Sequence, residues 1–364
     1  LEFIRVLFRS DQNLILDIGF DEGQGTMSFD RSSFGNDLLF FDTDNNLGIK
    51  NPSSDNWGQG LLGGAMETDG YEFQSNTIGE ISHSPSMGAL TNKITLMAWV
   101  NRDEVQHNVG IFSHDYPSIF FGFHNSLYKW EFPTDTGGEA SCYAGYSPPG
   151  QWVHVAATYD GNNAILYANG VEISRMPVQG NFILNPNESN FSTFTTSGFY
   201  QRLQNPSGNY NGSGVTDELD GRIDELKVYN RVLSRNEIVS QYLQGQLQNN
   251  PNLADCSQNS IVAEYMIGNN GVWIEGNNIE VSDGETVYIR AKGYSGEYFL
   301  TTPQKDGPTF SSVDDLSNHN AFNAYQVDTY VYNFGNPERN NGLVDPTNYG
   351  KFVLTTADGC PTVV

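Results

Sequence analysis

Positive charge is scarce in this sequence. Its 364 residues include 18 Lys and Arg against 43 Asp and Glu, so the formal net charge at pH 7 is −25. A surface this acidic repels nucleic-acid phosphates and anionic lipid headgroups, so we expect no nucleic-acid partner. Long apolar runs are absent as well, and none approaches the roughly 18 consecutive residues of a membrane-spanning helix. We therefore expect no membrane insertion.

Cysteine is scarcer still, with three residues in the whole chain. Cys256 and Cys360 lie near the two ends of the second half, and the first and last strands of a small sandwich commonly lie close together. A disulfide between them is therefore one interpretation, and two unrelated buried thiols are the other. Cys142 has no evident partner, so we expect it to pack as a small apolar residue.

Aromatic residues, glycine and short apolar segments are abundant. Aromatic residues make up 13% and hydrophobic residues 38%, and there are 38 Gly and 15 Pro. This composition can build cores and indicates many turns. Two predicted strands end at Asp160-Gly161 and Asn169-Gly170, which are typical hairpin turns. Together with the others, these strands predict an all-β fold of two packed antiparallel sheets. The predicted strands of the first half are residues 14–20, 94–100, 152–159, 164–168 and 221–229.

One predicted helix marks a domain boundary. Ser234 stands at its N-cap with Glu237 three residues later, which is the pattern of a capping box, and Leu233 and Ile238 are placed to form a hydrophobic staple. A polar stretch that contains Pro follows the helix and is typical of a linker. We predict a first domain at residues 11–247, a linker at 248–255 and a second domain at 256–364.

Residues 1–10 resemble nothing downstream, and we expect them to be a tail that arose from cloning or sequence assembly. They lack the apolar length and the cleavage site of a signal peptide. The alternative is that residues 3–8 add a β-strand to the edge of a sheet. Because the chain lacks an initial Met and stops abruptly, we expect it to be a fragment of a longer protein.

Several segments of the first half carry a family pattern: Phe20–Gly23 with Asp30–Asp37, Trp99–Val100, Gly150–Gly161, Leu166–Gly170, and Gly221–Tyr229 followed by the Ser234 helix. In this order they resemble the laminin-G-like, or concanavalin A-like lectin-glucanase, jelly-roll domain. Together they span nearly all of the first domain. The resemblance implies a jelly-roll sandwich, usually a non-catalytic glycan- or protein-binding module, and often a structural Ca²⁺.

The second half carries a different pattern. Residues 279–289 predict strand, turn and strand, and residues 349–360 look like a terminal hairpin. These segments resemble the immunoglobulin-like repeats of secreted and surface proteins of Bacteroidetes. The resemblance implies a smaller Ig-like β-sandwich and a secreted or cell-surface location. Residues 314–341 are longer and richer in Asn than is usual for such repeats.

Four residues are candidate calcium ligands. Ca²⁺ takes six to eight oxygen ligands at about 2.3–2.6 Å. Asp30 and Asn36 lie in a tight loop that matches the acidic loop of the family, with a departure at Phe34. Asp224 puts a charge inside a strand, and Asp69 lies in a Thr-Asp-Gly turn. We expect a structural Ca²⁺ here. The alternative is that Asp30 starts a turn, Asp224 accepts backbone hydrogen bonds and Asp69 lies in an exposed hairpin.

Glycan recognition needs aromatic faces and planar hydrogen-bonding groups. The most aromatic stretch is residues 113–130. Alternation there sends Phe121 and Phe123 to one face and Phe120 and His124 to the other, so one set is core and the other is free to line a binding face. Core packing or incidental exposure is the alternative for each candidate. The candidate ligand-binding residues are Trp57, Tyr116, His124, Trp130 and Tyr146.

These features predict a carbohydrate-binding or adhesive module of a secreted or cell-surface protein, with a polysaccharide or glycoconjugate as partner. The alternative is a structural subunit or spacer of a surface adhesin or filament, which self-associates or binds a protein and takes no glycan. A polysaccharide hydrolase or lyase ranks third. The carboxylates of residues 220–225 belong to the family's structural strand. His114, His124 and Tyr128 offer the Tyr/His pair of a lyase, but the acidic chain lacks the basic cleft that a polyuronate substrate needs.

Overall fold

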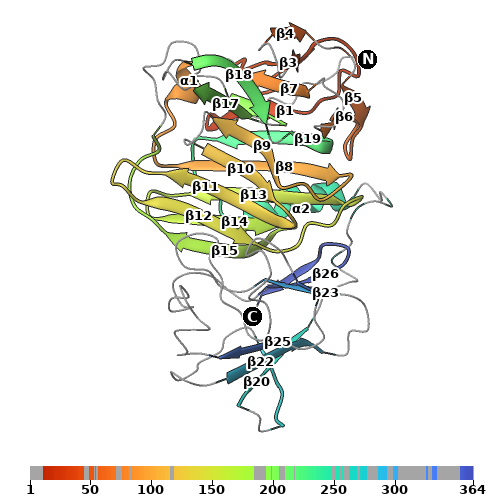
Figure 1. The fold of residues 1–364 in the computed structure, drawn as a ribbon, viewed down its shortest axis with the longest axis vertical. Coiled ribbons are helices and arrows are strands. Elements are labelled where there is room, and N and C mark those ends of the chain that lie inside the picture. The colour runs from red at the N-terminus through yellow and green to blue at the C-terminus, as the bar shows by residue number, and fades with distance from the viewer. Residues whose placement is uncertain are drawn as a thin grey trace, which may run out of the picture.

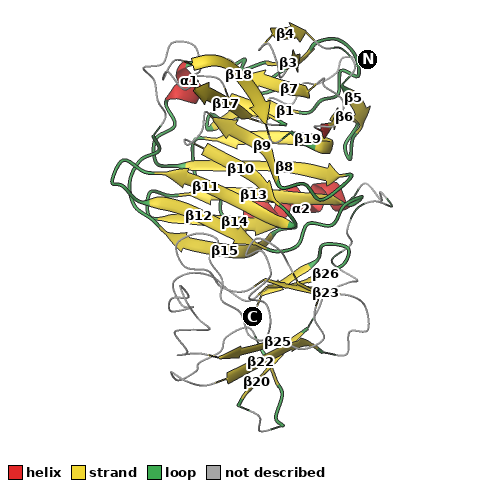
Figure 2. Cartoon of the chain, in the orientation of Figure 1, coloured by secondary structure: helices red, strands yellow, loops and turns green. Residues whose placement is uncertain are grey.

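The computed structural model is β-rich in both halves (Figures 1 and 2). It describes residues 11–44, 49–52, 54, 56–70, 76–81, 84–114, 119–183, 194–197, 199–204, 210–216, 218–247, 251, 253, 256, 262–268, 271–276, 286–292, 298–301, 325–326, 330–333 and 353–363. The tail at 1–10 lies outside these residues. No helix within the described part of the chain is long and apolar enough to cross a membrane.

The first sheet of the first half comprises β1 (Leu14–Ile18), β5 (Trp57–Gln59), β6 (Gly64–Asp69), β8 (Ile94–Arg102), β13 (Trp152–Tyr159), β14 (Asn163–Ala168), β15 (Val171–Pro177) and β19 (Asp220–Tyr229). Its spatial order is β15-β14-β13-β8-β19-β6-β5, and β1 pairs with β19. Neighbouring strands in this order are antiparallel. Strands distant in the chain therefore lie side by side, as a sandwich with crossing connections requires.

The second sheet comprises β2 (Met27–Ser28), β3 (Leu38–Asp44), β4 (Ile49–Pro52), β7 (Asn76–Ile81), β9 (Asn108–His114), β10 (Ile119–His124), β11 (Leu127–Pro133), β12 (Glu139–Ala144) and β16 (Phe194–Thr196). Its order is β12-β11-β10-β9-β16-β7-β3-β2, and β4 pairs with β3. A separate pair is formed by β17 (Phe199–Gln204) and β18 (Tyr210–Thr216). The short helix α1 (Pro85–Gly88) follows β7.

The two sheets share one apolar core. Leu96 and Val155 from the first sheet and Phe121, Phe123 and Trp130 from the second belong to the same buried cluster. Successive side chains of a strand point to opposite faces, so these residues mark the inner face of each sheet. The all-β prediction of two packed sheets is therefore confirmed for the first half.

The second helix, α2 (Arg235–Gln246), buries the outer face of the first sheet. Its Ile238 packs in a cluster with Met97 of β8, and its Tyr242 packs in a cluster with Trp99 of the same strand. The predicted capping box is present, with Ser234 at the N-cap and Glu237 at N3. Strand β8 is consequently buried along its whole length, on both faces.

The second half contains two smaller sheets. Strands β20 (Ala263–Ile267), β21 (Ile274–Glu275), β22 (Thr286–Ala291) and β25 (Tyr330–Asn333) form one, and β23 (Tyr298–Thr301), β24 (Tyr325–Gln326), β26 (Val353–Thr356) and β27 (Pro361–Val363) form the other. Figure 1 shows β23 and β26 next to the first half, with β20, β22 and β25 beyond them. The Ig-like assignment stays a prediction. Cys256 and Cys360 form a disulfide, and Cys142 is a buried free thiol.

Replacing Ser234 by Ala should lower the free energy of unfolding by about 1 kcal/mol. The Ser234 hydroxyl accepts the Glu237 N–H at 3.3 Å, and the Glu237 carboxylate accepts the Ser234 N–H at 2.7 Å. Urea unfolding of the variant measures the loss. Ser240→Ala is the matched control on the exposed side of the same helix and should change stability by less than about 0.5 kcal/mol. Equal losses in both variants would contradict a stabilising cap.

Candidate functional site

Strands β10, β11 and β12 carry a polar and aromatic cluster on the face away from the core. Cross-strand pairing places Phe120 opposite Glu131, Lys129 opposite Tyr143 and Glu131 opposite Ser141. These residues alternate with the core residues Phe121, Trp130 and Cys142, so their side chains share the outer face of the sheet. We name them, with His124 at the end of β10, the outer-face cluster: Phe120, His124, Lys129, Glu131, Ser141 and Tyr143.

Lys129 lies at the centre of the outer-face cluster. Its Nζ is 4.3 Å from the centroid of the Phe120 ring, 5.4 Å from that of Tyr143 and 3.3 Å from Glu131 Oε1. The other oxygen, Glu131 Oε2, accepts the Tyr143 hydroxyl at 2.5 Å and the Ser141 hydroxyl at 3.3 Å. A cation and a carboxylate thus neutralise each other between two aromatic rings.

His124 extends the outer-face cluster toward the exposed His107. Its Nδ1 bonds with Asn108 Oδ1, and its ring lies 4.5 Å from the His107 ring and 6.0 Å from the Tyr143 ring between centroids. Burial lowers the pKa of His124 to about 3, with smaller contributions from His107 and Lys129. The imidazole is therefore neutral at pH 7. Burial and the nearby Glu131 raise the pKa of Tyr143, so its hydroxyl keeps its proton.

The outer-face cluster is deep and has an accessible rim. Phe120, His124, Lys129 and Tyr143 are only 5–8% exposed, whereas His107 is exposed and Glu131 is half-buried. Rings, an imidazole, an amide and a carboxylate meet here in a region without net charge. At its rim, His107 and Glu131 can exchange hydrogen bonds with hydroxyl groups.

The structure places the candidate ligand-binding residues that it describes in different parts of the fold. His124 belongs to the outer-face cluster, and Tyr146 is half-buried. Tyr116 lies outside the described residues. The prediction for Trp130 is wrong, because its position opposite Phe121 turns it into the core with 0% exposure. Trp57 belongs to β5 and not to a loop, and it is half-buried; its Nε1 donates to the Gly25 carbonyl at 2.8 Å.

Asp30 and Asn36 organise their own loop. The Asp30 carboxylate accepts four hydrogen bonds at 2.6–2.9 Å, from the main-chain N–H groups of Asp17, Ser32 and Asn36 and from the Ser32 hydroxyl. The Asn36 amide donates to the Ile15 carbonyl at 2.6 Å. Both side chains are thereby occupied with protein groups.

Asp69 and Asp224 lie in β6 and β19 of the first sheet, in contrasting surroundings. Asp69 is exposed at the end of β6, opposite Asp220 of β19. Asp224 is 0% exposed; its Oδ2 accepts the Leu62 N–H at 2.8 Å, and no described residue donates to its Oδ1. Burial raises the pKa of Asp224 to about 7, and the negative charges of Glu225 and Asp21 contribute to this rise.

The sequence analysis missed an ion cluster beside Asp224. Arg31 Nη2 lies 2.8 Å from both Asp17 Oδ1 and Glu225 Oε1, and Lys227 Nζ contacts the other Glu225 oxygen. The one signal in the sequence is the charged pair Asp224-Glu225 inside a strand. Among the described residues, no group of three or more His, Cys, Asp or Glu side chains is arranged to hold a metal ion.

Comparison with known proteins identifies part of this chain. Residues 74–239 match the family model of the concanavalin A-like lectin/glucanases superfamily. These residues form a concanavalin A-like lectin/glucanase domain. They span β7 through the first turn of α2 and include the outer-face cluster and Asp224. No curated protein matches the sequence.

Three solved structures are among those that this chain is similar to. Domain 4 of AbnA, a GH43 extracellular arabinanase from Geobacillus stearothermophilus solved with arabinotriose, is 17% identical with a TM-score of 0.42, covering 63% of this chain and 97% of its own. The binding domain of botulinum neurotoxin DC, solved with rat synaptotagmin II, is 11% identical with a TM-score of 0.46, covering 96% and 86%. The binding domain of Paraclostridial Mosquitocidal Protein 1 is 10% identical with a TM-score of 0.45, covering 96% and 91%.

Stability should depend on the protonation of Asp224. Because its pKa is about 7 in the folded state against an ordinary value of 3.8, the folded state holds a proton that the unfolded chain has lost. This group therefore makes the free energy of unfolding, measured with a chelator present, fall from about pH 4 to about pH 7 and then level off. Comparing urea unfolding of the wild type and Asp224→Asn at each pH isolates this contribution.

The free energy of unfolding of Asp224→Asn should lack this fall, so the stability of the variant relative to the wild type should rise between about pH 4 and about pH 7. Asp69→Asn, which changes an exposed carboxylate on the same sheet, should follow the wild type. A constant difference between Asp224→Asn and the wild type from pH 4 to pH 8 would contradict the assignment.

Proposed function

We propose that this protein is a non-catalytic carbohydrate-binding module and that the outer-face cluster recognises the glycan. The observation that carries the proposal is the meeting of Phe120, Tyr143, His124 and Glu131 on one face of β10–β12. Sugars present hydroxyl groups that bond to carboxylates, amides and imidazoles. The match of residues 74–239 to a lectin and glucanase superfamily supports the same assignment.

The charge of the outer-face cluster favours an uncharged glycan. Lys129 is paired with Glu131, and His124 is neutral at pH 7, so the described cluster offers no unpaired cation to a carboxylate or sulfate group. Arg31, Arg175 and Arg231 of the same domain are likewise paired with acids. The net charge of −25 adds a general repulsion of polyanions.

The contacts of Glu131 argue for binding without catalysis. Both oxygens of Glu131 are engaged, one by Lys129 and the other by the hydroxyls of Tyr143 and Ser141. A carboxylate held this way is a poor nucleophile and a poor proton donor. Burial and the nearby Glu131 raise the pKa of Glu139, and a raised pKa is what a general acid needs. Measuring the release of reducing ends from a polysaccharide therefore checks the proposal that the protein is not a hydrolase.

The wild-type chain should bind a neutral polysaccharide, and Glu131→Gln and His124→Ala should each weaken that binding by about tenfold to a hundredfold. Isothermal titration against a panel of neutral and acidic polysaccharides measures both effects. Asp69→Asn, on the opposite sheet, is the control and should bind as the wild type does. Absence of binding to every glycan would refute the function, and stronger binding to uronate or sulfated glycans would refute the charge argument.

We further propose that a structural Ca²⁺ binds at Asp224 and not at the Asp30 loop. Asp224 Oδ1 is a fully buried carboxylate oxygen without a described donor, which fits a cation ligand, whereas four hydrogen bonds already occupy Asp30. Asp21 accepts the Gly64 N–H at 3.2 Å in the turn whose Leu62 N–H bonds to Asp224. An ion held by these residues would compensate the buried charge and fix the turn.

Calcium should raise the melting temperature of the wild type, and chelation should lower it, because an ion that binds only the folded state stabilises that state. Asp224→Asn should abolish the response, and Asp30→Asn should retain it. Differential scanning fluorimetry with Ca²⁺ or a chelator distinguishes the two. An unchanged melting temperature in the wild type would rule out a structural Ca²⁺.

We also propose a secreted or cell-surface location. The Cys256–Cys360 disulfide supports it, since disulfides form and persist in oxidising compartments.

A further inference from the structure

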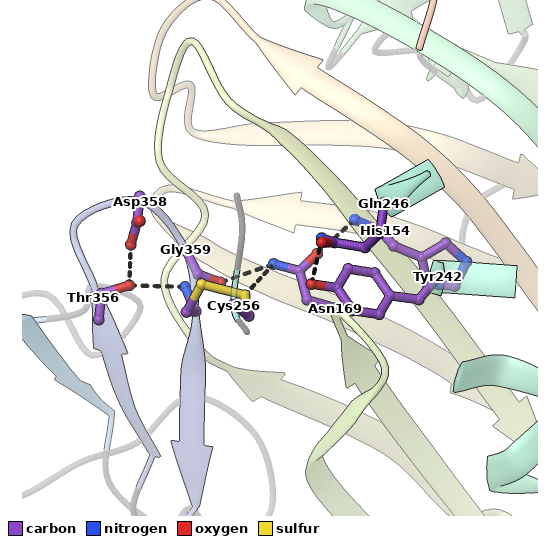
Figure 3. Close-up of a disulfide and its surroundings, with 9 residues drawn as sticks. His154, Asn169, Tyr242, Gln246, Cys256, Thr356, Asp358 and Gly359 are labelled. Carbon is purple, nitrogen blue, oxygen red and sulfur yellow. Dashed lines mark hydrogen bonds between the residues drawn. A yellow bond between two sulfur atoms is a disulfide. The ribbon is translucent and has the colours of Figure 1, made fainter. Parts of the chain in front are cut away.

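The Asn169 turn links the first half of the chain to the second. Asn169 begins the turn between β14 and β15, with φ at +47° and 3% exposure. Its main-chain N–H donates to the His154 carbonyl at 2.8 Å, and its Oδ1 accepts the His154 N–H at 2.9 Å. These two bonds hold the side chain against β13 with its amide nitrogen pointing outward (Figure 3).

That amide nitrogen contacts the second half. Asn169 Nδ2 donates to the Gly359 carbonyl at 3.0 Å and lies 3.7 Å from Cys256 Sγ. The orientation of the amide follows from chemistry, because the end that meets the His154 N–H must be the oxygen and the end that meets a carbonyl must be the nitrogen. A carboxylate of the same size would satisfy the first contact and repel the second.

The C-terminal hairpin packs directly on the sandwich at this point. Gly359, at its turn, has φ at +93°, and a Cβ placed on it would lie 3.0 Å from Pro148 Cδ and 3.4 Å from Val153 Cγ1. Val353 of β26, in the same hairpin, belongs to the buried core cluster of the sandwich. The interface is therefore close-packed as well as hydrogen-bonded.

The segment that follows α2 makes a second contact. Leu253 forms a parallel bridge with Trp152 and packs against the cluster that contains Trp99 and Tyr242. Three residues later, Cys256 is joined to Cys360, which is buried beside Gly359. The disulfide thus connects the two contacts that the second half makes around Asn169 (Figure 3).

We propose that Asn169 and the Cys256–Cys360 disulfide form a clamp that holds the two halves of this chain as one rigid body. Asn169 supplies the directional contact. The disulfide joins the Leu253 segment to the C-terminal hairpin, so that neither segment detaches from the sandwich without the other. Strands β26 and β27 thereby serve as the partner surface of β13–β15. This coupling is independent of whether the protein binds a glycan.

The clamp is tested on the full chain with Asn169→Asp, with Cys256→Ser/Cys360→Ser, and with all three changes together. Asp tolerates the same positive φ and can accept the His154 N–H, so Asn169→Asp removes the contact between the halves and leaves the turn intact. Asn125→Asp is the matched control, since Asn125 also has positive φ, at +52°, in the β10–β11 turn. Calorimetry and limited proteolysis between residues 247 and 262 are the measurements.

We expect the wild type and Asn125→Asp to unfold in one transition and to resist cleavage. Asn169→Asp should split the transition in two and speed cleavage by on the order of tenfold, and the triple variant should be cleaved fastest. Two transitions in the wild type would overturn the rigid body. The clamp would be overturned if Asn169→Asp were cleaved at the wild-type rate, or if the sandwich of that variant unfolded at a lower temperature without faster cleavage. Either result would mean that Asn169 stabilises only its own turn.

Discussion

Alternation of side chains across β10, β11 and β12 governs the binding half of this protein. The inner face must fill the core with rings such as Phe121 and Trp130, so the residues between them are held at fixed positions on the outer face. One of these is Lys129, whose charge is costly to bury without a partner. Glu131 and the rings of Phe120 and Tyr143 offset that cost, so the contacts within the outer-face cluster follow from the need to bury Lys129.

Local signals predicted much of the fold and only part of the site. The turns at Asp160-Gly161 and Asn169-Gly170 and the Ser234 capping box depend on neighbours in sequence, and each stands where it was predicted. Trp130 depends on the register between β10 and β11, which an aromatic run does not reveal. Alternation grouped His124 with Phe120 and left open which face is core, whereas Lys129, Glu131 and Tyr143 required knowledge of which strands pair.

The acidic pair in β19 shows how a bulge separates two carboxylates by function. Strict alternation after Ile223 would turn Glu225 toward the core, but the register shifts between Asp224 and Lys227, and φ of Glu225 is +51°. Glu225 therefore reaches Arg31 and Lys227. Burial raises the pKa of Glu225, but the attraction of these two cations lowers it further, so the pKa is lowered overall and the carboxylate is ionised. Asp224 remains beneath the Leu62 turn, whose main-chain N–H it accepts. Sequence identified Asp224 as unusual, but the strained residue beside it is visible only in the structure.

Asn169 illustrates why a correct local prediction can miss a second role. Its turn needs a residue that tolerates positive φ, and Asn, Asp and Gly all meet that need. Only Asn also carries a donor beyond the acceptor that His154 uses, and the carbonyl it reaches lies 190 positions away, at Gly359. Local sequence constrains the turn and is silent about the distant partner. The choice of Asn over Asp at this position is explained by the contact between the halves, because the turn itself does not distinguish them.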